Sequence, residues 1–311
     1  MEINYINKKI EIKEDIVAAI GEFDGMHLAH QELIKKCITL SKNNNCKSAI
    51  ICFYPHPDYV LHKRENKGYL NTLQEKIKII EKFNIDYLYI LDFNEELLTT
   101  TKEEFYNNYL SKLKGIVIGY DFRFAYQGSG DKDYLYSMFK DKIFEVIEKK
   151  TYINEFKKED KISSNAIRSY LDNGNIEYAN KLLSYHYQFE GNVEKGKKVG
   201  KELGYPTANI SIEKDKYIPK LGVYACLIEL DNKKYQGICN IGINPSIDNL
   251  NKARIEVNIF DFDGNIYNKN IKIELIHFLR EEIKFNTKEE LKEEIKKDEE
   301  IIKSFFRSHY E

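Results

Sequence analysis

The hydrophobic pattern of this 311-residue chain changes near Tyr187, and this change constrains the fold more than any other feature. Before that point, short apolar runs alternate with stretches whose apolar residues recur at helical spacing. After it, short strand patterns follow one another, separated by Gly, Pro, Asn and Asp. Alternating strands and helices are typical of a parallel α/β sheet, whereas consecutive short strands are typical of an antiparallel barrel. The sequence therefore predicts two differently folded parts.

The first part, residues 1–183, is predicted to be a Rossmann-like α/β domain. Continuous apolar runs indicate strands that are buried on both faces, and the helices between them cover those faces. Ligands of such folds bind beyond the carboxyl ends of the strands. The expected strands are Ile16–Ile20, Ser48–Phe53, Tyr87–Leu91, Gly115–Gly119 and Ile143–Ile147, and the expected helices are His30–Leu40, Leu73–Phe83, Thr101–Leu113, 164–173 and Ile176–Leu183.

The second part, residues 184–311, is predicted to be a six-stranded antiparallel β-barrel that is followed by a helix. The Asp263-Gly264 pair predicts a tight hairpin between the strands on either side of it. Thr287–Phe306 has the pattern of a charged amphipathic helix that packs against the barrel. The expected strands lie near residues 187–194, 207–212, 222–230, 234–240, 254–262 and 270–278.

The composition indicates a soluble globular protein of the cytoplasm. Hydrophobic residues make up 42% and charged residues 32% of the chain, which excludes a disordered protein. A net charge of −2 argues against nucleic acid as the main partner. The five cysteines form no CxxC pair, so we expect reduced thiols and no zinc site. No signal peptide or transmembrane run is evident, so we expect no membrane partner.

A histidine pair follows the first predicted strand, in the segment Gly21–His30. His27 and His30 are three residues apart, so at the start of a helix both imidazoles lie on one face. A helix N-terminus favours anions, and two imidazole donors there are suited to holding phosphates. The alternatives are two ordinary surface histidines or a metal pair, but the latter lacks a third ligand nearby.

A second set of polar residues lies on the predicted barrel strands. Thr207 and Asn209 are two residues apart, so both side chains point the same way on an extended strand. Both offer the hard oxygen ligands that Mg²⁺ takes together with phosphates. The carboxylate of Glu256, on a later strand, is suited to accept a proton from an attacking hydroxyl. The alternative is that residues 206–209 merely begin a strand.

Three glycines, Gly191, Gly196 and Gly200, punctuate a basic stretch upstream of Thr207. Glycine-bearing backbone can approach phosphates closely and offer N–H groups to them. The run 191–197 nearly matches a P-loop, but Lys198 stands where the Ser or Thr is required and no helix follows. We therefore reject a P-loop and expect a different phosphate-binding loop.

These motifs resemble the prokaryotic bifunctional riboflavin kinase/FMN adenylyltransferase (FAD synthetase) family over nearly the whole chain. Gly21–His30 and Ile162–Arg168 resemble the nucleotidyltransferase motifs of its first half, and 204–209 with Glu256 resemble its riboflavin kinase half. The resemblance implies Mg²⁺ as cofactor, and ATP, riboflavin and FMN as small-molecule substrates. It implies catalytic roles for Glu256, His27 and His30, metal binding by Thr207 and Asn209, flavin binding by Asp121, Phe122 and Arg280, and phosphate binding by Gly21, Phe23, Asp24, Gly25, Ser164, Arg168, Gly191, Gly196 and Gly200.

The chain departs from the family pattern at a few positions. In the first half, Ala29 and Ala125 stand where glycine is usual, and Asn165 stands where threonine is usual. Ala125 is unfavourable only if its backbone needs a positive φ. In the second half, Ser246 replaces a threonine, while Asn258 and Asn268 replace a histidine and a glycine.

Two other functions fit parts of the sequence. One is a riboflavin kinase whose first domain binds nucleotide or flavin but turns over poorly, a hypothesis that rests on Ala125 and Asn165. The other is a flavin-responsive regulator that binds RNA and has lost its chemistry. The complete set of Thr207, Asn209 and Glu256, together with the lack of a basic surface run, argues against the regulator. The sequence predicts no oligomeric state.

Overall fold

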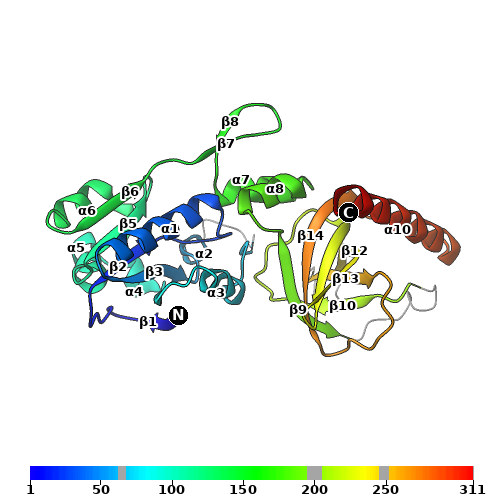
Figure 1. Ribbon diagram of the computed structural model, residues 1–311, viewed down its shortest axis with the longest axis horizontal. Helices are drawn as coiled ribbons and strands as arrows, with labels where there is room; N and C mark the ends of the chain where they lie inside the picture. Colours follow the sequence, from blue (N-terminus) through cyan, green and yellow to red (C-terminus); the bar gives the residue numbers. More distant parts are fainter. Residues whose placement is uncertain (62–67, 195–204, 245–251, 311) are drawn as a thin grey trace. The chain divides into compact units, whose positions relative to one another are not determined.

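The computed structural model describes residues 1–61, 68–194, 205–244 and 252–310, which form two compact units, Met1–Ser164 and Asn165–Glu311 (Figure 1). The sequence placed the boundary between the two domains at 183/184. In the structure, α8 (Ile176–Leu183) and all of α7 (Ser164–Asp172) beyond its first residue fall in the second unit.

The first unit is built on a six-stranded sheet with the order β1-β4-β3-β2-β5-β6, in which all neighbouring strands are parallel. This confirms the predicted Rossmann-like α/β architecture. The edge strand β1, which the sequence did not predict, is only partly buried, and Tyr5 in it is 63% exposed. The strands are β1 (Glu2–Ile6), β2 (Ile16–Ile20), β3 (Lys47–Tyr54), β4 (Tyr87–Asp92), β5 (Gly115–Gly119) and β6 (Ile143–Ile147).

The helices of the first unit begin where the sequence supplies caps. Thr72 and Glu75 form a capping box at the start of α3, and Thr101 and Glu104 form another at α5. The helix expected over 101–113 is divided into α5 and a π-helical turn, η1. The described elements are α1 (Leu28–Asn43), α2 (Pro57–Val60), α3 (Leu73–Glu81), α4 (Glu95–Thr99), α5 (Lys102–Phe105), η1 (Tyr106–Leu110), η2 (Tyr126–Gly128) and α6 (Lys132–Met138).

A short antiparallel hairpin, β7 (Thr151–Ile153) with β8 (Glu159–Lys161), leads the chain from β6 to α7. The sequence analysis did not predict it, since its strands are only three residues long and largely polar. Its second strand ends at Lys161, and Ile162 and Ser163 then connect it to Ser164, the first residue of α7.

The second unit is a closed barrel with the strand order β10-β13-β12-β11-β14-β9, which confirms the predicted six-stranded barrel. Alternation along β13 separates an inner face, with Ile255 and Val257 buried, from an outer face that carries Glu256. The strands are β9 (Gln188–Glu194), β10 (Ala208–Ser211), β11 (Gly222–Leu230), β12 (Lys233–Asn244), β13 (Lys252–Ile259) and β14 (Asn270–Arg280).

The hairpin predicted at Asp263-Gly264 is wrong. β13 pairs with β10 and β12, whereas β14 pairs with β11 and β9, so the two strands flanking this dipeptide are not neighbours. The connection instead crosses from one side of the barrel to the other. A local turn signal cannot identify strand partners that closure of the barrel selects.

The C-terminal helix α10 (Lys288–Tyr310) packs on the barrel as predicted. Ile302 and Phe306 are buried in a cluster with barrel residues that include Val223 and Phe260. A bidentate ion pair reinforces this contact, since Arg280 Nε and Nη2 donate to Asp298 at 2.9 and 2.6 Å. Arg280 thus holds the helix to the end of β14 in the structure.

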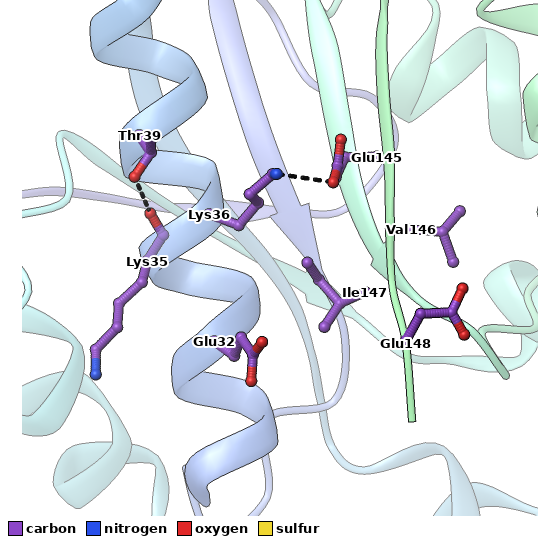
Figure 2. A pocket seen from close by; sticks show the side chains of 8 residues that line it. All are labelled: Glu32, Lys35, Lys36, Thr39, Glu145, Val146, Ile147 and Glu148. Atoms are coloured by element: carbon purple, nitrogen blue, oxygen red, sulfur yellow. Dashed lines mark hydrogen bonds and ion pairs between the residues drawn. The ribbon is translucent and has the colours of Figure 1, made fainter. Parts of the chain in front are cut away.

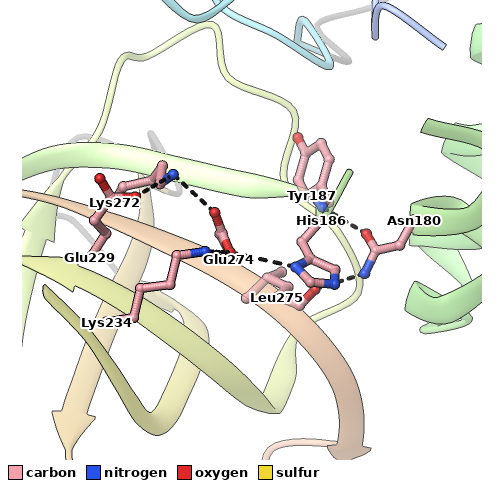
Figure 3. A network of polar contacts seen from close by, with 8 residues as sticks. All are labelled: Asn180, His186, Tyr187, Glu229, Lys234, Lys272, Glu274 and Leu275. Carbon is pink, nitrogen blue, oxygen red and sulfur yellow. Dashed lines mark hydrogen bonds and ion pairs between the residues drawn. The ribbon is translucent and has the colours of Figure 1, made fainter. Parts of the chain in front are cut away.

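A polar network ties α8 to the barrel (Figure 3). The Asn180 amide donates to the Leu275 carbonyl at 2.8 Å and accepts the Tyr187 N–H at 2.6 Å. Beside it, Glu274 contacts Lys272 at 2.9 Å and His186 at 3.5 Å. The hydrogen bond from His186, supported by Lys272, holds the pKa of Glu274 far below its usual value. These contacts explain why α8 belongs to the barrel unit.

The backbone of Ala125 is strained. Its φ is 64° and its ψ is −176°, a conformation that is almost restricted to glycine. Such a residue costs about 1–3 kcal/mol when it carries a Cβ atom. The usual glycine of this position therefore has a conformational reason, and its replacement by alanine destabilises the loop after β5.

We expect Ala125→Gly to raise the free energy of unfolding of the first unit by about 1 kcal/mol, because relief of strain exceeds the added entropy of the unfolded chain. Chemical denaturation followed by circular dichroism measures this difference. Ala29→Gly is the matched control: Ala29 lies in the first turn of α1, where glycine lowers stability. Equal destabilisation by both substitutions would contradict the strain at Ala125.

Candidate functional site

The turn that joins β2 to α1 carries the first group of predicted residues. The Gly21 N–H donates to the Ile51 carbonyl at 3.2 Å, so the turn begins while still attached to the neighbouring strand β3. Phe23, Gly25 and Met26 then have φ values of 52°, 83° and 42°. These left-handed residues reverse the chain at the carboxyl edge of the sheet, where ligands of such folds bind.

Asp24 is buried within this turn and accepts hydrogen bonds through both its side chain and its carbonyl. Its side chain is 1% exposed, and Oδ1 accepts the Leu70 N–H at 2.9 Å. Its carbonyl accepts the Ser164 hydroxyl at 2.8 Å, so the structure brings the first and later predicted phosphate motifs together. A carboxylate that accepts backbone N–H groups offers no donor to a phosphate. The position of Asp24 therefore favours a structural role over the predicted phosphate contact.

His27 and His30 form a stacked pair at the start of α1. Their ring centroids are 3.6 Å apart with an interplanar angle of 15°. His27 is the N-cap, and its Nδ1 accepts the His30 N–H at 3.4 Å, so a neutral His27 carries its proton on Nε2. Nδ1 of His30 is buried and has no hydrogen-bond partner among the residues that the structure describes. The pair thus retains polar atoms for a ligand.

Burial keeps both imidazoles neutral near pH 7. It lowers the pKa of His27 to about 4, against a smaller opposing effect of the Asp24 charge. Burial, followed by His27 and the positive charges of Lys76 and Lys161, lowers the pKa of His30 well below its usual value. Neutral imidazoles can offer N–H donors to a ligand, whereas positive charge near the pair comes from lysines.

Asp121, the predicted flavin-binding carboxylate, forms an ion pair with Lys161, whose ammonium also lies over the Tyr120 ring at 4.9 Å. Phe122 is half-buried and stacks on Phe124 with ring centroids 5.8 Å apart. The sequence analysis missed Lys161, although its place directly before the Ile162–Arg168 motif was a usable signal. The charges of Lys161 and Asp121 act on the pKa of His27 in opposite directions, Lys161 lowering it and Asp121 raising it, and both effects are smaller than that of burial.

Arg168, the other predicted phosphate ligand, lies in the second unit of the chain. It is 5% exposed, and its guanidinium lies 5.3 Å from the centre of the Tyr217 ring. The Tyr217 hydroxyl in turn contacts Asp172, one helical turn after Arg168 on α7. These contacts pack α7 against the barrel unit.

The second group of predicted residues lies on the outer face of the barrel. Asn209 on β10 is directly opposite Glu256 on β13, and Glu256 is directly opposite Asn240 on β12. On the other side, Asn209 faces Glu194 of β9. Side chains directly opposite each other in a sheet have Cβ atoms about 5 Å apart. The barrel therefore places two carboxylates and two amides in one row across its strands.

Glu256 is 25% exposed at its side chain, so it is accessible and partly desolvated. Its charged neighbour on the same strand is Arg254, with Nη1 at 3.9 Å from Oε1. Arg254 also approaches Glu282 at 3.9 Å, and its Nε is buried without a hydrogen-bond partner within the described ranges. Arg254 thus forms only long contacts with these two carboxylates, and it lies beside Glu256.

Thr207 and Asn209 fit a hard cation. Their side chains accept no hydrogen bond from any other described residue, and neither is fully buried. The amide of Asn258 donates to the Pro206 carbonyl at 2.8 Å, which fixes the backbone directly before Thr207. Asn258, a departure from the family pattern, therefore supports the strand start. A hydroxyl, an amide oxygen and a nearby carboxylate are the donor set that Mg²⁺ prefers.

The remaining predicted site residues are three glycines and Arg280. Gly191 lies inside β9 and not in a loop, and a Cβ atom there would come within 2.0 Å of the Ser211 carbonyl oxygen. Its position therefore indicates close strand packing. Gly196 and Gly200 lie outside the described residues, as does Ser246. Arg280, predicted to contact flavin, is engaged with Asp298 in the structure.

An open surface hollow lies between α1 and β6 (Figure 2). It is crossed by an ion pair between Lys36 and Glu145 at 2.8 Å, and Thr39 donates to the Lys35 carbonyl at 2.9 Å. None of the predicted site residues lines this hollow. We assign no binding role to it.

No group of three or more His, Cys, Asp or Glu side chains in the described ranges is arranged to hold a metal ion. The helices that the structure describes include none that is long and apolar enough to cross a membrane.

Comparison with known proteins places both halves of the chain. Residues 9–166 match the family described as FAD synthetase, and residues 183–306 match the family described as riboflavin kinase. A bifunctional riboflavin kinase/FMN adenylyltransferase from Buchnera aphidicola is 40% identical over 310 residues, which is 98% of each chain. The protein of that name from Listeria monocytogenes is 36% identical and covers 93% of this chain and 92% of its own.

A solved structure supports the same arrangement of elements. The crystal structure of a protein named macrolide-efflux protein, from Streptococcus pneumoniae, matches with a TM-score of 0.86 at 29% identity. The match covers 96% of this chain and 98% of the other. Together with the two matched domains and the near-complete coverage of the relatives, this settles the family. The chain belongs to the bifunctional riboflavin kinase/FMN adenylyltransferase family.

Proposed function

We propose that this protein phosphorylates riboflavin to FMN with MgATP and then transfers AMP from a second ATP to FMN, which yields FAD and pyrophosphate. The observation that carries the first reaction is the cross-strand pairing of Asn209 with Glu256 beside Thr207. The second rests on the stacked, neutral histidine pair at the N-terminus of α1. We assign adenylyl transfer to residues 1–183 and phosphorylation to residues 184–311, as the matched ranges support.

In the kinase reaction, Glu256 is the general base. Its carboxylate accepts the proton of the terminal ribityl hydroxyl while that oxygen attacks the γ-phosphorus of ATP, and the bond from this phosphorus to the β,γ-bridging oxygen breaks. Thr207 and Asn209 would hold Mg²⁺, which neutralises charge on the phosphates when bound. Asn240, on the other side of Glu256, is placed to orient the base or the substrate.

In the adenylyl transfer, the phosphate of FMN attacks the α-phosphorus of ATP and pyrophosphate leaves. His27 Nε2–H is a donor to the phosphates, since its Nδ1 is already used as an acceptor at the helix N-terminus. Neutral imidazoles stabilise the leaving charge by hydrogen bonds, which act strongly in a buried site. Ser164 fixes the turn from the other side through the Asp24 carbonyl.

A riboflavin kinase with a silent first domain is the second candidate, because Ala125 is strained in the loop beside Phe122. The strain is local to a loop and leaves the histidine pair, Ser164 and Lys161 in place. A weaker flavin site lowers the rate of the second reaction and does not remove its phosphate-binding groups. The bifunctional activity is therefore the better supported proposal.

Reciprocal variants test the two activities separately. Glu256→Gln should lower FMN formation by at least about 100-fold because the general base is lost, while FAD formation from supplied FMN stays unchanged. His30→Ala should give the reverse pattern. Chromatographic assays of each reaction with the full chain measure both rates. Loss of both activities in either variant would contradict two separate sites.

The pH dependence of stability tests the burial of neutral His27. Its pKa is about 4 when folded, against about 6.5 when unfolded, so the unfolded chain binds more protons between these values. The contribution of neutral His27 to the free energy of unfolding is therefore fully present above pH ~6.5. It decreases on acidification and is about 2 kcal/mol smaller at pH ~5. His27→Asn keeps an N-cap acceptor without a titrating ring, so this part of the pH dependence should disappear.

Denaturant unfolding of the two proteins at several pH values gives the comparison. We subtract the unfolding free energy of His27→Asn from that of wild type. This value should decrease as the pH falls from 6.5 toward 5, because only the wild type loses stability through protonation of His27 in the unfolded chain. A difference that stays constant over this range would show that His27 is protonated equally in both states, which contradicts its assignment as a neutral donor.

A further inference from the structure

Lys76 is a buried lysine close to the histidine pair. It lies on α3, its side chain is 2% exposed, and it is among the largest fully buried side chains described. Lysine is almost never fully buried unless it is paired. Yet its ammonium donates to a neutral acceptor, the Glu22 carbonyl, at 2.8 Å, and it forms no ion pair with any described carboxylate. This arrangement needs an explanation.

The acceptor is part of the turn that carries the site. Glu22 directly precedes the left-handed residue Phe23, and the turn continues through Gly25 to His27. The Glu22 carboxylate is held as well, since His56 Nε2 lies 2.7 Å from it and His56 is 2% exposed. Lys76 and His56 therefore fix both polar groups of one residue at the carboxyl end of β2.

The charge of Lys76 also reaches the histidine pair. The ring of Phe23, the residue after Glu22, lies 5.3 Å from the ring of His30, so the turn that Lys76 anchors packs against this imidazole. In agreement with this proximity, the Lys76 charge contributes, after burial and His27, to the low pKa of His30. A desolvated cation without an anionic partner acts strongly on an anion that binds nearby.

We propose that Lys76 is a further positioning residue of the adenylyl-transfer site, which anchors the β2–α1 turn and places a positive charge near the phosphates of bound ATP. The inference rests on the proposed adenylyl transfer. It explains why a lysine is buried here without a carboxylate: the ATP phosphates provide its counter-charge when they bind. The contrasting explanation is a purely mechanical tether between α3 and the turn.

Lys76→Met tests the charge, since it keeps the length and apolar stem of the side chain. We expect kcat/KM for ATP in FAD formation to fall about 10- to 100-fold, as for loss of a hydrogen-bonded charge. KM for FMN should change little, and pyrophosphate should inhibit more weakly. The pKa of His30, measured by NMR titration, should rise. FMN formation from riboflavin should be unchanged in the same protein.

Lys142→Met is the matched control. Lys142 lies in the same unit and also donates to a backbone carbonyl, that of Ser111, but it is remote in the fold from the histidine pair, near the start of β6. This variant loses a comparable tether, so ATP kinetics and the pKa of His30 should stay as in wild type. Lys76→Arg retains the charge and should restore most of kcat/KM for ATP.

Unchanged ATP kinetics in Lys76→Met would overturn the proposal. So would equal losses for ATP and FMN with no rise in the pKa of His30, since these mark a mechanical tether. If Lys76→Met does not fold, Lys76→Arg is the deciding variant. A near-normal kcat/KM for ATP in Lys76→Arg supports the role. A loss of 10-fold or more in a folded Lys76→Arg protein overturns it, because a loss of about this size is the lower limit expected when the charge is removed. A wild type that makes no FAD would refute the proposed function itself, a separable result.

Discussion

The register between β10 and β13 is the constraint on which the proposed kinase site depends. β10 is four residues long, and it closes the barrel by pairing with β9 on one side and β13 on the other. A slip of one residue would turn Asn209 to the inner face and replace it on the outer face with an apolar neighbour. Barrel closure thus sets both the fold and the alignment of Asn209 with Glu256.

In the first unit, the position of the histidine pair depends on a turn that other residues hold in place. One backbone bond, from Gly21 N–H to the Ile51 carbonyl, joins the start of the turn to β3. The rest of the Gly21–Gly25 turn is held by side chains from elsewhere in the chain. Asp24 holds the Leu70 amide, Ser164 holds the Asp24 carbonyl, and Lys76 holds the Glu22 carbonyl. These contacts order residues with left-handed backbone and present the stacked imidazoles at the helix N-terminus, where buried donors act strongly.

Much of this could be predicted from the sequence, because hydrophobic periodicity is a local signal. β2, β5, β6, α8 and β11 begin and end where the pattern indicates. Strand partners are not local, which is why the hairpin at Asp263-Gly264 was wrong and the edge strand β1 was missed. The conditional expectation for Ala125 was informative, since its φ is positive in the structure.

The roles of single residues were harder to predict than the site itself. Burial and counter-charge depend on tertiary neighbours, so Lys76 looked like any other helix lysine, and Asp24 like a phosphate-binding residue. Arg280 and Gly191 belong to the same class: one is engaged by Asp298 and the other is required by strand packing. A motif indicates which segment forms a site, but packing decides which of its side chains face a ligand.

The most direct test of the account is a time course with the full wild-type chain, riboflavin, ATP and Mg²⁺, in which the flavins are separated by chromatography. We predict that FMN appears first and is then converted to FAD. FMN that accumulates without FAD, at any enzyme concentration, would contradict the role assigned to the first unit. Folded protein that forms neither product would contradict the account of both sites.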